Sequence, residues 1–126
     1  MDKIKFSTDK DARDLEHIFK KLSERYPLGE DPWGLNLKKA IRSLAYILPL
    51  YRHYFKVRVF GKEKVENKKY MVVSNHSGQI AIDGMLITTA FAVDIDPPRI
   101  LRSMVERFFT GIPFVGAWAQ EGGAVL

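Results

Sequence analysis

A histidine and an aspartate near the middle of the chain are the side chains best suited to acid–base chemistry. They lie in the run VVSNHSGQIAID of residues 72–83, with six residues between His76 and Asp83. An imidazole accepts a proton near neutral pH, and a carboxylate on its other ring nitrogen fixes the tautomer and stabilises the imidazolium. Such a pair can activate a substrate hydroxyl as a nucleophile without a protein serine or cysteine.

The spacing of the two residues sets a condition on this chemistry. On one continuous helix His76 and Asp83 would share a face but lie about 10.5 Å apart along the axis, too far for a hydrogen bond. They meet only if Ser77-Gly78-Gln79 folds as a turn that returns His76 to the start of the next helix, and Gly78 favours such a turn. The alternative is that His76 caps a strand end and that Asp83 only complements the helix dipole.

The elements that would position this pair are predicted to alternate between strands and helices. Short apolar or alternating runs predict strands over Phe55–Gly61, Tyr70–Ser74 and Arg99–Val105. Helices are predicted over Ile80–Val93 and Glu106–Thr110, followed by a glycine-rich loop that includes Glu121 and Gly122. Strands that alternate with helices predict an α/β fold.

Two helices are predicted ahead of these elements as an N-terminal lead. The first is capped by Ser7 or Thr8 and has one apolar face, made of Leu15, Ile18, Phe19, Leu22 and Tyr26. The second runs from about Pro32 to Tyr54, with Asp31 as its cap, and bends or ends near Pro49. Three cations, Lys38, Lys39 and Arg42, lie off the apolar face of the second helix.

The charge distribution points to an anionic partner. The chain has 126 residues and a formal net charge of +5, and residues 32–62 hold seven basic residues and no acid. Such a stretch suits a phospholipid surface, nucleic acid or a phosphorylated substrate. The longest apolar run is far short of the ~20 residues that a spanning helix needs. Because the chain has no cysteine and its three histidines are scattered, we expect no metal site.

The segment Asn75–Asp83 after a short apolar strand resembles the opening motif of the glycerolipid acyltransferases, the lysophosphatidate acyltransferase superfamily. That motif is Asn-His-x-x-x-x-Asp, whereas this chain has six residues between the histidine and the aspartate. The resemblance implies that His76 is the general base and that Asp83 orients it. Asn75, Ser77 and Gly78 would then contact the substrate. The implied donor is acyl-CoA or acyl carrier protein, with no further cofactor, and the acceptor is a lysophospholipid hydroxyl in phospholipid biosynthesis.

The resemblance extends to the following block, from Arg99 to Gly116, but the family's later Phe-Pro-Glu-Gly block is missing. We therefore expect residues 1–31 to be an N-terminal helix and linker, and residues 32–126 to be the N-terminal portion of an acyltransferase-like domain. The chain would be a fragment or a truncated product with an incomplete glycerolipid acyltransferase-like fold. It would act in the cytoplasm, peripherally on the membrane, with Lys38, Lys39 and Arg42 against anionic lipid.

A second hypothesis explains the basic stretch without catalysis. The chain would then be a binding module for a membrane surface or for RNA. RNA is the weaker version because the basic run is mixed with aliphatic residues and has no stacking platform, so no nucleic acid is expected. The other two histidines, His17 and His53, are expected to be structural.

Overall fold

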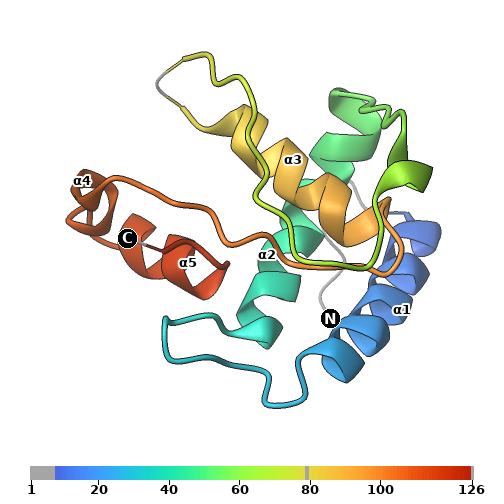
Figure 1. Ribbon diagram of the computed structural model, residues 1–126, viewed down its shortest axis with the longest axis horizontal. Coiled ribbons are helices and arrows are strands. Elements are labelled where there is room, and N and C mark those ends of the chain that lie inside the picture. The colour runs from blue at the N-terminus through green and yellow to red at the C-terminus, as the bar shows by residue number, and fades with distance from the viewer. Residues whose placement is uncertain (1–7, 79, 126) are drawn as a thin grey trace.

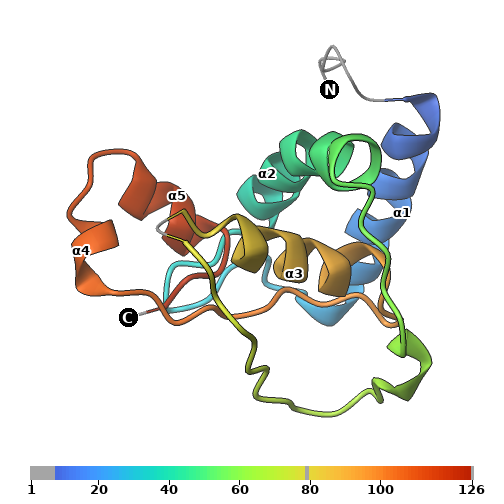
Figure 2. The ribbon, with the colours of Figure 1, turned by 90° about the horizontal axis from the view of Figure 1, so that it is seen from above.

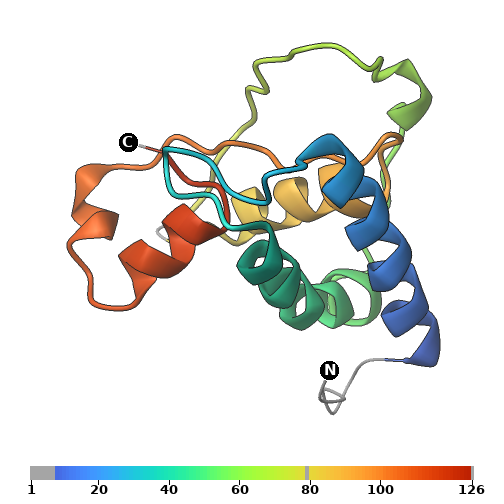
Figure 3. The same ribbon diagram turned by 90° about the horizontal axis from the view of Figure 1, so that it is seen from below.

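The chain folds as helices joined by loops and extended segments. The computed structural model describes residues 8–78 and 80–125, and it is drawn in Figures 1, 2 and 3. The α-helices are α1 (Asp9–Arg25), α2 (Leu37–Pro49), α3 (Ile82–Val93), α4 (Arg107–Thr110) and α5 (Val115–Glu121). A π-helical turn η1 (Leu50–Tyr54) continues α2, and a 3-10 turn η2 (Lys62–Lys64) follows.

The first helix forms as its sequence predicts. Thr8 caps α1 and pairs with Asp11 in a capping box, in which each side chain bonds to the backbone N–H of the other residue. The buried face of α1 carries Leu15, Ile18 and Leu22 at helical spacing. Ser7, the alternative cap, lies outside the described residues.

The second helix begins later than its sequence predicts. The expected cap, Asp31, instead accepts hydrogen bonds from the backbone N–H of Trp33 and Leu35 and so closes a loop. Asn36 caps α2 by accepting from the N–H of Lys39. The prediction that this helix starts at Pro32 is therefore wrong. Its other end agrees with the sequence, since α2 stops at Pro49 and passes into η1.

The core lies where α2 meets its neighbours. Helix α2 contacts α1, α3 and α5 (Figures 1 and 2). Its buried residues are Leu37, Ile41, Leu44, Ala45 and Leu48, and they cluster with Leu15, Ile18 and Leu22 of α1, Leu35, Tyr51, Ala90, Ala92 and Ile100. Burial of this apolar surface is the main force that holds the helices together.

The prediction of an α/β fold is wrong, because residues 8–78 and 80–125 contain no β-strand. No ladder of hydrogen bonds joins the three segments expected to be strands, and the first departs from extended backbone, with φ +50° at Lys56 and +75° at Gly61. Val57 and Val59 do pack against the core, so the alternation marks a half-buried face rather than a strand. Tyr70–Val73, expected to be covered on both sides, is exposed. Apolar alternation identifies residues that suit a strand, but a strand also needs a partner at its edge.

The C-terminal part forms a helical hairpin where the sequence predicts a loop. Helix α4 agrees with the predicted short helix, but α5 covers most of the predicted loop and includes Glu121. In all three views the hairpin of α4 and α5 lies at the end of the molecule opposite α1, and α5 lies against α2. Among the described residues, two polar side-chain contacts join α5 to α2: Trp118 Nε1 donates to Ser43 Oγ (2.8 Å), and Glu121 pairs with Lys39.

Candidate functional site

The side chains of His76 and Asp83 contact each other. His76 Nδ1 lies 2.9 Å from both carboxylate oxygens of Asp83, which stands in the first turn of α3. The contact that the sequence predicts is therefore present.

A turn and a late helix start bring the two residues together. Gly78 has φ +96°, in the region that favours glycine, and α3 begins only at Ile82. The N–H of Ser77 donates to Asp83 Oδ2 (3.0 Å), which pulls the turn back over the helix start. His76 precedes the helix instead of lying on it. The distance of about 10.5 Å expected for His76 and Asp83 on one continuous helix therefore does not separate them. Gln79, the remaining residue of the predicted turn, lies outside the described residues.

The surroundings keep Asp83 ionised. The N–H groups of Ser77 and Gly84 lower the pKa of Asp83 most, and His76 lowers it further. The carboxylate of Asp83 accepts a hydrogen bond from the Nδ1–H of His76, and in this tautomer Nε2 carries the free lone pair. Nε2 is the atom that can take a proton from a bound hydroxyl.

The pair lies at the surface. The side chain of His76 is 57% exposed and that of Asp83 is 29% exposed. Asn75, Ser77 and Gly78 are also exposed beside it. A large substrate can therefore reach the imidazole without any movement of the chain.

Two cavities lie away from this pair. One of about 230 Å³ is lined by His17 and Lys21 of α1 and by Asp94 and Asp96 after α3. The other, of about 420 Å³, lies between Trp33 and the end of α5 at Gln120. His17, predicted to be structural, thus borders the first of these cavities.

The three cations predicted to face lipid differ in their surroundings. Lys39 is paired with Glu121 of α5. Lys38 and Arg42 are exposed on α2. All three residues are thus at the surface, and the side chain of Lys39 is 58% exposed where α2 borders α5.

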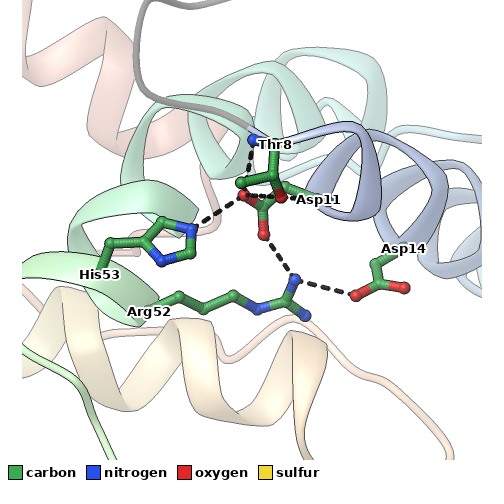
Figure 4. A network of polar contacts seen from close by, with 5 residues as sticks. All are labelled: Thr8, Asp11, Asp14, Arg52 and His53. Atoms are coloured by element: carbon green, nitrogen blue, oxygen red, sulfur yellow. Dashed lines mark hydrogen bonds and ion pairs between the residues drawn. The ribbon is translucent and has the colours of Figure 1, made fainter.

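The buried carboxylate of Asp11, in the first turn of α1, links α1 to η1 (Figure 4). Asp11 is 1% exposed and accepts from Arg52 Nη1 (2.6 Å), while its other oxygen lies 3.1 Å from His53 Nε2. Arg52 also pairs with Asp14 (2.9 Å). Burial acts to raise the pKa of Asp11, but hydrogen bonds from Thr8, His53 and Arg52 outweigh it and hold the pKa well below 3.8. This network gives His53 a structural role.

Arg99 holds the segment that leads to His76. It is 7% exposed and donates to the carbonyl oxygens of Glu66 and Lys68, at 3.2 Å each. Its guanidinium lies 6.0 Å from the ring centroid of Tyr70. Arg99 thereby ties the start of the extended segment before Asn75 to the end of α3, where its own N–H donates to Phe91.

The described part of the chain contains neither a metal-binding cluster nor a membrane-spanning helix. Within residues 8–78 and 80–125, no three His, Cys, Asp or Glu side chains gather as a metal would require. None of the helices described here has the length and apolar character needed to cross a bilayer.

Comparison with known proteins finds a distant similarity to mycobacterial proteins. The chain is 29% identical over 87 residues to Uncharacterized protein Rv0502 of Mycobacterium tuberculosis and to Uncharacterized protein Mb0514 of Mycobacterium bovis. The match covers 65% of this chain and 24% of each relative, so the chain spans about a quarter of their length. No family model and no solved structure matches the chain.

Proposed function

We propose that the chain carries the acid–base pair of an O-acyltransferase that moves an acyl group from a thioester to a lysophospholipid hydroxyl. The supporting observation is the contact of His76 Nδ1 with Asp83 at 2.9 Å, with Nε2 on an exposed surface. The pair carries the two roles that the acyltransferase resemblance implies. The site is proposed to work peripherally on the cytoplasmic face of a membrane, where such acceptors reside.

In the proposed reaction, Nε2 of His76 removes the proton from the acceptor hydroxyl while Asp83 stabilises the imidazolium. The alkoxide oxygen forms a bond to the thioester carbonyl carbon. The tetrahedral intermediate then breaks its carbon–sulfur bond, and the imidazolium returns its proton to the leaving thiolate. The N–H of Ser77 is already donated to Asp83, so the Ser77 hydroxyl is the group proposed to support the oxyanion.

Three variants test this role. His76→Ala removes the base, and loss of a general base lowers a rate by about 10²–10⁴-fold. Asp83→Asn keeps the size of the side chain but removes its negative charge, so we expect a loss in the same range. His17→Ala is the matched control because His17 is exposed on α1, away from the pair. Rates are measured as thiol release from acyl-CoA together with acylated lipid formed.

The measurement also separates catalysis from simple binding. If His76→Ala transfers acyl groups as fast as the His17→Ala control, the proposed base is wrong. If the wild-type chain binds anionic lipid but forms no acylated product, the binding-module hypothesis replaces the enzyme.

A further inference from the structure

The α4–α5 hairpin exposes large apolar side chains that the fold leaves uncovered. Phe114, directly before α5, is 90% exposed, and Val115 and Trp118 are partly exposed on α5 itself. Phe114 also has φ +65°, which a bulky side chain rarely adopts. A strained backbone that holds an aromatic side chain in solvent gives nothing to the core, and such outliers point to a function outside the fold.

The contacts between α5 and α2 make this apolar surface continuous with a cationic one. Trp118 and Glu121 of α5 bind Ser43 and Lys39 of α2. Arg42 and Tyr46 lie three residues after Lys39 and Ser43, and therefore on the neighbouring row of the same helix face. That outer row, four residues apart at each step, is made of the exposed residues Lys38, Arg42 and Tyr46 of α2 and Leu50, the first residue of η1.

The residues on the hairpin and on the outer row of α2 indicate what kind of partner this combined surface binds. The outer row is cationic at its first half and apolar at its second, and it extends for about 18 Å. Residues 32–62 contain no acid, and the nearby Glu121 is neutralised by Lys39. Cations beside aromatic and aliphatic side chains are the pattern of a surface that lies in the headgroup region of an anionic bilayer.

We infer that the α4–α5 hairpin and the outer row of α2 together bind an anionic membrane, with Phe114 in the acyl boundary and Lys38 and Arg42 on the lipid phosphates. The surface is defined without His76, and only its purpose, to bring the site to its acceptor, rests on the proposed function.

Tryptophan fluorescence with vesicles tests the inference. The chain has two tryptophans, Trp33 and Trp118, so Trp33→Phe leaves a single reporter on α5. Vesicles of phosphatidylglycerol and phosphatidylcholine are added to this variant. We expect a blue shift of the Trp118 emission and quenching by brominated acyl chains, with a much weaker response to phosphatidylcholine alone.

Two serine variants in the Trp33→Phe background form a matched comparison. Phe114→Ser removes the inserted ring, and we expect roughly tenfold weaker vesicle binding. Phe60→Ser makes the same chemical change at a side chain that is 83% exposed. Phe60 lies in the segment between η1 and η2, which is opposite the hairpin in Figures 1 and 3. We expect Phe60→Ser to bind as the parent does.

Three results would overturn the inference: equal binding by Phe114→Ser and Phe60→Ser, no change in Trp118 emission with anionic vesicles, or a concentration-dependent dimer that Phe114→Ser abolishes. Sedimentation without lipid detects the last case, in which a second copy covers the hairpin. His76→Ala separates this inference from the proposed function. It should bind vesicles normally, so loss of catalysis and loss of membrane binding are read independently.

Discussion

The buried carboxylate of Asp11 allows a quantitative prediction about what holds α1 to the rest of the fold. Asp11→Asn keeps the size of the side chain and an oxygen that can accept from Thr8, so the helix cap survives in part. It removes the charge opposite Arg52 and His53. Breaking a buried ion pair costs about 3–5 kcal/mol. Arg52 keeps Asp14 and is 26% exposed, which reduces the expected loss to about 2–3 kcal/mol.

Asp14→Asn is the matched control for this measurement. Asp14 also pairs with Arg52, but its side chain is 36% exposed. Exposed pairs contribute about 0–1 kcal/mol, so the control should change the free energy of unfolding little. Urea unfolding followed by circular dichroism measures both variants. In thermal unfolding, we expect Asp11→Asn to lower Tm by roughly 8–12 °C.

The pH dependence of the free energy of unfolding independently tests whether the charge of Asp11 stabilises the fold. The pKa of folded Asp11 is lowered, so this residue stabilises the fold fully above its unfolded pKa of about 3.9 and loses that effect as the pH falls toward the folded pKa. The stability difference between wild type and Asp11→Asn should therefore shrink below about pH 4. Equal urea midpoints for wild type and Asp11→Asn would refute the reasoning. A stability difference between these two proteins that does not shrink as the pH falls would also refute it.

Two further substitutions test the packing. Leu48→Ala removes a fully buried side chain and should lower the free energy of unfolding by about 2–5 kcal/mol. Leu50 is half exposed, so Leu50→Ala should change this free energy by less than about 1 kcal/mol. Equal losses in urea unfolding would contradict the assigned core. Gly123 has φ +113°, and Gly123→Ala adds a Cβ 2.9 Å from the carbonyl oxygen of Leu101. This variant should lower Tm more than Gly29→Ala, because Gly29 has φ +69° and nothing lies within 4 Å of an added Cβ there. The reverse order of Tm values in calorimetry would contradict this local geometry.

The sequence predicts features within one segment of this chain better than contacts between segments that are distant in the chain. The period of Leu15, Ile18 and Leu22 and the cap at Thr8 predict α1 correctly, because both signals arise within a few turns of one helix. The predicted strands were wrong because alternation describes one segment, whereas a strand also requires a neighbour. Helix α5 was missed because the glycines within and after it, Gly116, Gly122 and Gly123, are typical of a loop. Its contacts with α2 also join residues that lie far apart in the chain.

In the candidate site, too, a contact within one short segment was predictable and a contact between distant segments was not. The His76–Asp83 contact was predictable because Gly78 allows a turn within a short stretch. The pairing of Lys39 with Glu121 was not, since the two residues are 82 positions apart in the chain. The Asp11 network is intermediate. The Thr8–Asp11 capping box can be recognised in the sequence, but the approach of Arg52 depends on the packing of α1 beside η1.

The most direct test of the central proposal is the detection of acylated lipid. The chain is mixed with a labelled acyl-CoA and lysophosphatidate in anionic vesicles, and phosphatidate is quantified by mass spectrometry. The account predicts phosphatidate formation that depends on protein concentration and falls by about 10²–10⁴-fold with His76→Ala. No product above the protein-free rate, or equal product from His76→Ala, would contradict it.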